Sequence, residues 1–153
     1  MQARVTHGHP AAVAAAAAVA ALVFDGIAGG APTSDVPSGI TDAQFVAAWH
    51  AAHRDFTSGE RLPRQLRNVA MSGWETVAAA HAISLVHAGD PERAIGAPAA
   101  SGGDTDTAAC IVGAIVGARN GYAALPEHWA GTMHEPSRRL CDAAATALVA
   151  ATT

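Results

Sequence analysis

The sequence predicts an all-α protein, and three features of its 153 residues point that way. Hydrophobic residues make up 50% of the chain, and their excess is alanine, which has the highest helix propensity. Apolar residues recur in several segments at the three- and four-residue spacing of one helix face. No segment shows the alternation of apolar and polar residues that a half-buried strand requires. We therefore expect one helical domain over residues 1–153.

The first two helices are predicted from their end signals. A helix from Pro10 to Phe24 begins with proline, which suits the first helical position, and ends at a loop rich in Gly, Pro, Ser and Asp. The next helix, to about Asp55, should have Thr41 as its N-cap, with Gln44 completing a capping box. The three- and four-residue spacing predicts a buried face made of Phe45, Ala48, Trp49 and Ala52.

Three later helices are predicted in the same way. The segment from Gly73 to His87 should be a helix with four side chains that face the core: Trp74, Val77, Ala78 and Leu85. A short helix should follow Asp90 as N-cap, with Pro91 in its first turn. The last helix should begin at Pro136 and carry an apolar stripe made of Leu140, Ala144, Leu148 and Ala151.

The segment from Thr105 to Asn120 is apolar or small at nearly every position. A helix of that kind is normally buried at the centre of a bundle, and Gly121 should end it. Gly113 and Gly117 lie on one face, and each lowers helix stability by about 1 kcal/mol relative to alanine. We therefore expect another helix to approach closely at these two glycines.

Charge and composition exclude several classes of partner. The net charge is −4, the chain has no lysine, and only three of its scattered arginines cluster, on what we expect to be a solvated helix face: Arg61, Arg64 and Arg67. This pattern argues against nucleic acid as a partner. Residues 11–24 are too short and too weakly apolar to span a bilayer, so no membrane partner is expected.

The two cysteines, Cys110 and Cys141, have neither metal-site nor disulfide spacing. We expect both to be buried small hydrophobes and the protein to be cytoplasmic, in a reducing compartment. An alternative follows from the N-terminus, where an arginine precedes an alanine-rich stretch that partly resembles a signal peptide. On that interpretation the chain is a small secreted helical protein that is cleaved near Ala31.

The segment Gly102 to Thr107, "GGDTDT", carries the strongest chemical signal. One interpretation is capping, since Asp104 or Thr105 could accept a hydrogen bond from a free amide of the first turn. Capping leaves the second carboxylate, Asp106, without a role. The other interpretation is a metal site, because two carboxylates and a hydroxyl form a compact all-oxygen face that suits Mg²⁺, Mn²⁺ or Ca²⁺.

Three known acidic motifs have features in common with this segment. An EF-hand loop needs an acidic or amide side chain and then a glycine where this chain has Ala108 and Ala109. A dehalogenase-type motif needs its threonine one position later than Thr107, after an apolar strand. The short Asp-x-Asp motif of glycosyltransferases stays open, although it should also follow a strand.

The segment "GGDTDTAACIVGAIVGARNGYAALPEHW" resembles the C-terminal metal motif of the ADP-ribosylglycohydrolase family. The family pattern is Gly-Gly-Asp-Thr/Ser-Asp-Thr/Ser, then an alanine- and glycine-rich helix, then Pro-x-x-Trp, which matches Pro126 and Trp129 here. The segments "RVTHGHPAAVAAAAAVAALV" and "GWETVAAAHAISLV" resemble family segments in the same order.

The resemblance implies an all-α orthogonal helix bundle with a binuclear Mg²⁺ or Mn²⁺ centre. It implies hydrolysis of the glycosidic bond between ADP-ribose and a protein side chain or small molecule. By residue-to-residue matching, Asp104, Asp106 and Thr107 are expected to be metal ligands, the two aspartates are expected to be catalytic, and His7 is expected to line the ADP-ribose site.

The chain departs from the family pattern in one respect. Similar proteins carry an N-terminal half with a glycine-rich acidic motif and a Thr-Asp-Asp motif, and no Asp-Asp pair occurs here. The expectation is therefore a C-terminal portion of the family's domain that supplies half of the metal ligands and is inactive alone. The alternative is a non-enzymatic relative that binds metal or ADP-ribose weakly, or that associates with another chain.

The remaining histidines have weaker signals. His50 and His53 lie three residues apart on one helix face, as a metal-binding pair would, but no third ligand is evident. His81 and His87 share a helix and are expected to be surface residues or hydrogen-bonded core residues.

Overall fold

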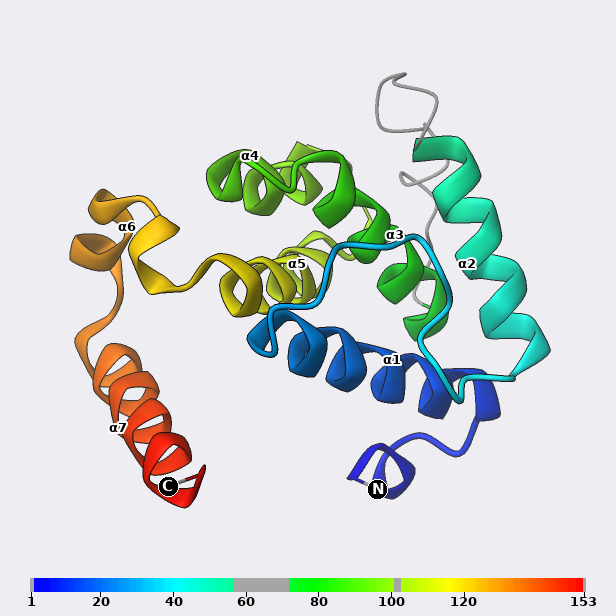
Figure 1. Ribbon diagram of the computed structural model, residues 1–153, viewed down its shortest axis with the longest axis horizontal. Coiled ribbons are helices and arrows are strands. Elements are labelled where there is room, and N and C mark those ends of the chain that lie inside the picture. The colour runs from blue at the N-terminus through cyan, green and yellow to red at the C-terminus, as the bar shows by residue number, and fades with distance from the viewer. Residues whose placement is uncertain (1, 57–71, 101–102, 153) are drawn as a thin grey trace.

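The computed structural model describes residues 2–56, 72–100 and 103–152 (Figure 1). In these ranges every regular element is a helix, which confirms the all-α prediction. The elements are η1 (Gln2–Val5), α1 (Pro10–Ile27), α2 (Ala43–Phe56), α3 (Gly73–Val86), α4 (Pro91–Gly96), η3 (Pro98–Ala100), α5 (Thr105–Asn120), η4 (Tyr122–Ala124), α6 (Glu127–Thr132) and α7 (Glu135–Thr152). The predicted arginine cluster of Arg61, Arg64 and Arg67 lies outside the described residues, as does Gly102.

Helix α3 is the central helix of the bundle. It contacts α1, α2, α4 and α5, and its residues are buried in an unbroken run from Thr76 to Ser84. The small side chains of Ala78, Ala79 and Ala80 allow other helices to approach α3 from several sides. The prediction that Thr105 to Asn120 forms the central helix was therefore wrong, although the predicted bounds of that helix match α5.

The first part of the core joins one face of α1 to the predicted face of α2. Phe45 and Trp49 of α2 are fully buried and pack with an alanine-rich stripe of α1: Ala11, Ala15, Ala18 and Leu22. Burial of a large apolar side chain contributes about 1.5–3 kcal/mol. The Trp49 indole Nε1–H donates to the Ser34 carbonyl at 2.8 Å, which ties the α1–α2 loop to this core.

The start of α2 differs from the prediction. Asp42 is the capping residue, because its Oδ1 accepts a hydrogen bond from the Phe45 amide at 2.9 Å. Helix α2 begins at Ala43, so Thr41 lies one position too far from the first turn to cap it. The capping box of Thr41 and Gln44 was therefore wrong. By contrast, Asp90 caps α4 as predicted, by accepting from the Arg93 amide at 2.9 Å.

Helix α5 is buried along one side. Its fully buried residues are Val112, Ile115 and Val116. A Cβ added at Gly113 would approach Ile95 only to 3.9 Å, and one at Gly117 would meet nothing within 4 Å. The expected close contact at these two glycines was therefore wrong.

The close approach to α5 occurs instead at Gly26 of α1. A Cβ built there would lie 3.1 Å from Cγ of Arg119 and 3.2 Å from Cβ of Ala118. The glycine at this position therefore allows the C-terminal ends of α1 and α5 to meet.

The C-terminal helices α6 and α7 lie to one side of the bundle (Figure 1). Helix α7 begins at Glu135, one residue before the predicted start, but the described side chains of its expected stripe are not covered: Leu140 is 72% exposed, and Ala144 is also exposed. Glu135 forms surface ion pairs with Arg138 and Arg139. Cys110 of α5 and Cys141 of α7 are both exposed free thiols, so the expectation that they are buried was wrong.

Helix α1 is longer than predicted and ends at Ile27. By length and apolar composition it could cross a membrane, with a mean hydropathy of 1.9 over its 18 residues. A core helix and a signal sequence both meet that criterion. In this structure one face of α1 packs in the core, while Phe24 and Ile27 are exposed at its end.

Candidate functional site

The acidic motif lies at the start of α5. Gly103 has a φ of +81°, a left-handed conformation that glycine adopts without strain, and the Thr105 amide donates to its carbonyl at 2.9 Å. The chain therefore turns at Gly103 directly before Asp104, the residue at the N-cap position.

Asp104 occupies the N-cap position of α5, but its carboxylate makes no capping hydrogen bond of normal geometry. Hydrogen bonding lowers the pKa of the Asp104 carboxyl below its ordinary value, first from the Thr107 side chain, next from Asp106 and least from the Thr107 backbone amide in the first turn of α5. The three side chains therefore meet at the first turn of α5, where Asp104 is half-buried and the other two are exposed.

These three side chains supply only part of a metal site. Carboxylate and hydroxyl oxygens are donors that Mg²⁺ and Mn²⁺ prefer, so the chemistry of the donor set fits such an ion. In the part of the chain that the structure describes, no three His, Cys, Asp or Glu residues converge to hold a metal. An ion that prefers about six oxygen ligands would need further donors.

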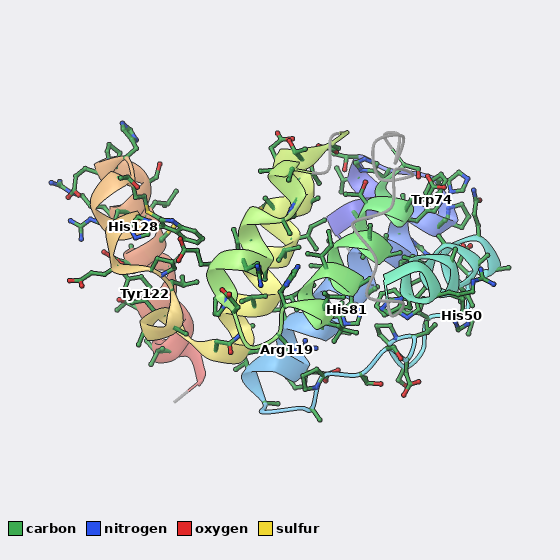
Figure 2. The ribbon with its side chains drawn as sticks, turned by 90° about the horizontal axis from the view of Figure 1, so that it is seen from above. His50, Trp74, His81, Arg119, Tyr122 and His128 are labelled. Carbon is green, nitrogen blue, oxygen red and sulfur yellow. The ribbon has the colours of Figure 1, made fainter. Side chains whose placement is uncertain are left out.

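His7 lies just before α1, and its ring is exposed. Its Nδ1 pairs with the Thr6 hydroxyl at 2.9 Å. Helices α1 and α5 pack together and run in the same direction, so their N-terminal ends lie at the same end of the bundle (Figures 1 and 2). The structure thus puts His7 and the two aspartates at one end of the bundle, although no hydrogen bond joins them among the described contacts.

His9 forms a better-defined feature at this end of the bundle. Its Nδ1 accepts a hydrogen bond from the Ala11 amide at 3.3 Å, so His9 is the N-cap of α1. Its ring stacks on the Trp74 ring with centroids 4.7 Å apart, which joins the start of α1 to the start of α3 (Figure 2). The sequence signal for this contact was weak, because histidine is not among the preferred capping residues.

A groove of about 630 Å³ lies beside the N-terminal half of α1. Its lining includes Arg4, Pro10 and Val13 on one side and Ile40 and Asp42 on the other. Asp104 and Asp106 do not line this groove. This groove and the paired carboxylates are therefore separate features of the surface.

The histidine that pairs with His53 in the structure is not the one that the sequence suggested. His53 bonds to His81 across α2 and α3, with Nε2 and Nδ1 2.9 Å apart, while His50 is exposed. Helical spacing suggested His50 and His53 because they share a face, but it cannot show which residue of another helix faces His53. His81 is fully buried, as one of the two interpretations of it expected.

Comparisons with known proteins identify one family. The family model for ADP-ribosylglycohydrolase matches residues 1–153, the whole chain. A search of curated proteins and a search of solved structures each gave no significant match.

Proposed function

Because the chain belongs to the ADP-ribosylglycohydrolase family, we propose that it supplies one side of a divalent-cation site for cleaving the glycosidic bond of ADP-ribose conjugates. Family membership supports a glycohydrolase-type function. The proposed substrates are ADP-ribosylated proteins or small-molecule ADP-ribose conjugates, and the proposed ions are Mg²⁺ or Mn²⁺.

The observation that carries the proposal is the meeting of Asp104, Asp106 and Thr107 at the first turn of α5. A carboxylate at an N-cap normally accepts a hydrogen bond from the helix, but that of Asp104 makes no capping bond of normal geometry, and the Thr107 side chain and Asp106 act on it more strongly than the Thr107 amide does. Its pKa is lowered from an ordinary value that already leaves it ionised at neutral pH. An ionised carboxylate that lies beside a second carboxylate is available to bind a cation.

In the proposed site, Asp104, Asp106 and Thr107 hold the cation through their oxygen atoms. When bound, such an ion polarises the scissile centre and lowers the pKa of a bound water. The two carboxylates provide the negative charge that holding a dication requires. His7, at the same end of the bundle, is proposed to line the ADP-ribose site, where its exposed ring could donate to an acceptor on the ligand.

The second part of the proposal is that residues outside this chain complete the site. Three oxygen donors leave an octahedral ion about half coordinated, and no further acidic group converges on them in the described residues. We therefore propose that residues 1–153 alone have little activity. A non-enzymatic relative is the second candidate, and it is favoured by the same shortage of ligands.

The proposed location is the cytoplasm. Cys110 and Cys141 are exposed free thiols, and such thiols persist best in a reducing compartment.

Two measurements test the proposal. Titration of the chain with Mn²⁺ by calorimetry should show binding that Asp106→Asn weakens strongly. Glu92→Gln is the matched control, because Glu92 is also an acidic residue in the first turn of a helix, α4, and it should leave binding unchanged. Equal binding by all three proteins, or no binding by any, would remove the cation site from the proposal.

The activity measurement tests the shared site. Release of ADP-ribose from modified arginine and serine peptides should be negligible with residues 1–153. It should appear after co-expression with an N-terminal half that carries a Thr-Asp-Asp motif. Metal-dependent turnover by the chain alone, lost in Asp106→Ala, would show that no further half is needed.

A further inference from the structure

The groove beside α1 is a second concave feature, which the proposed cation site does not use. It is lined by Arg4 of η1, by the N-terminal half of α1 and by the end of the α1–α2 loop. Its volume of about 630 Å³ falls within the range of about 300–1,000 Å³ that is typical of ligand pockets. Gly8 lines the groove and directly follows His7, so the groove adjoins the residue that is proposed to line the ADP-ribose site.

The lining of the groove carries one charge of each sign. Arg4 contributes a guanidinium, and among the described residues no ion pair joins it to a carboxylate. Asp42 contributes a carboxylate whose Oδ1 accepts from the Phe45 amide, while its other oxygen has further acceptor capacity. The apolar side chains of the lining are Pro10, Val13, Ala14, Ala17 and Ile40. The groove therefore combines a cation, an anion and an apolar surface.

This lining does not suit the ADP part of a substrate. The described residues that line the groove include no aromatic side chain, so they offer no ring on which a base could stack. A diphosphate would meet one guanidinium and one carboxylate, Arg4 and Asp42, whose charges cancel. A ligand with a group of each charge and little net charge matches the groove better.

We propose that the groove binds the peptide that flanks the modified side chain of an ADP-ribosylated protein, an inference that rests on the proposed function. The peptide places an acidic residue at Arg4 and a basic residue at Asp42, with small or apolar residues between them. Gly8 and Gly39 favour a peptide as the ligand, because a Cβ built at either meets nothing within 4 Å. The backbone of a ligand can therefore approach the chain closely at both glycines.

Titration with short unmodified peptides tests the groove. The probes are acetyl-Glu-Ala-Ala-Arg-amide and the reversed sequence, acetyl-Arg-Ala-Ala-Glu-amide, because a peptide can enter in either direction. In ¹H–¹⁵N NMR spectra, one of the two should shift the amide signals of Gly8 and Gly39 saturably. The signal of Gly96, on α4 and outside the groove, should not shift. The lack of a saturable shift at Gly8 and Gly39 with both peptides would overturn the proposal.

Charge-removing variants test how the peptide is held. Arg4→Gln should weaken binding of the better peptide about twofold to fivefold, as expected for an exposed ion pair, but should not affect a peptide with Gln in place of its Glu. Asp42→Asn keeps a good N-cap residue for α2 and should have the same relation to the peptide's Arg. Arg93→Gln and Glu92→Gln on α4 are the matched controls and should leave the affinity unchanged. Equal losses in the controls would overturn the proposal.

The peptide titrations use no divalent cation and no ADP-ribose, so they fail separately from the proposed function. A chain that binds Mn²⁺ but neither peptide would keep the cation site and lose the peptide groove. A chain that binds a peptide but no Mn²⁺ would keep the groove and lose the proposed reaction. If a variant does not fold, the peptides with Gln in place of Glu or Arg decide the question on the unaltered chain, since an affinity that ignores their charges would overturn the proposal.

Discussion

Helices α3 and α7 are both rich in alanine, yet their surroundings are opposite. The residues of α3 are buried in an unbroken run from Thr76 to Ser84, and other helices surround it. Every side chain of α7 that the structure describes is exposed, including Leu140 and Val149. The apolar spacing of α7 is the more regular of the two. Periodicity therefore shows which face of a helix could be buried, but it does not show whether another element covers that face.

The largest expected effect comes from truncating one large side chain in each helix. Ile83→Ala in α3 should lower the free energy of unfolding by about 2–5 kcal/mol, because it leaves a cavity in a packed core. Leu140→Ala in α7 should change it by less than about 0.5 kcal/mol, because Leu140 is already 72% exposed. Urea unfolding of the two variants provides the comparison. A loss in Leu140→Ala as large as that in Ile83→Ala would mean that another surface covers α7 in solution.

The second expected effect is a dependence of stability on pH that arises in α3. Burial first, then the charges of His53 and Arg119, lower the pKa of His81 from 6.5 to about 3. The unfolded chain therefore binds a proton below pH 6.5 that the folded chain excludes until about pH 3, so stability is lost as the pH falls through this window. At 1.36 kcal/mol per unit, the loss at pH 5 is about 2 kcal/mol from this residue.

The comparison that isolates His81 uses His81→Phe, which keeps an aromatic ring against Trp49. Unfolding by urea at pH 7 and at pH 5 should show a smaller difference for the variant than for the unaltered chain. His53, whose pKa burial also lowers, should keep a residual dependence of the same sign. Equal pH dependence in both proteins would mean that His81 is accessible to protons in the folded state.

Much of the fold could be predicted from the sequence because helix ends have local signals. Pro10, Asp90 and Gly121 each mark a boundary through their own backbone or side-chain chemistry. Which helix is the most deeply buried could not be predicted in this way. The uniformly apolar pattern that suggested α5 as the central helix also describes α3, and only tertiary packing distinguishes them.

The acidic motif could be located from the sequence because its residues lie close together along the chain. Asp104, Asp106 and Thr107 occupy one turn, so their meeting needs no tertiary contact. The pairing of His53 with His81 and the stacking of His9 on Trp74 join residues far apart in the sequence. Neither contact leaves a pattern of spacing, and both could be found only from the structure.

A third comparison concerns two glycines, one packed and one open. Gly26→Ala should lower stability by about 1 kcal/mol, because the new methyl would lie 3.1 Å from Arg119 Cγ and overpacking outweighs the gain in helix propensity. Gly117→Ala meets nothing within 4 Å and should raise stability by up to about 1 kcal/mol. Thermal unfolding of both variants provides the test. Stabilisation by Gly26→Ala would show that α1 and α5 are less closely packed in solution.

The smallest expected effect distinguishes two aspartates at helix N-termini. Asp90 accepts a hydrogen bond from the Arg93 amide, so Asp90→Ala should lower stability by about 1 kcal/mol. Asp104 makes no capping bond of that geometry and only a weaker interaction with the Thr107 amide, so Asp104→Ala should cost less than Asp90→Ala. The two variants should be compared by urea unfolding without divalent ions, since a bound ion would stabilise only the chain that keeps Asp104.

The same two variants should reverse their order when Mn²⁺ is present. A ligand that binds only the folded chain raises its stability in proportion to the logarithm of concentration over Kd. Added Mn²⁺ should therefore stabilise the unaltered chain and Asp90→Ala, but not Asp104→Ala. A loss in Asp104→Ala as large as that in Asp90→Ala, with no response to Mn²⁺ in any of the three proteins, would show that Asp104 serves only to cap α5. The carboxylates at the start of α5 would then have a structural role, and the cation site would have to lie elsewhere in the chain.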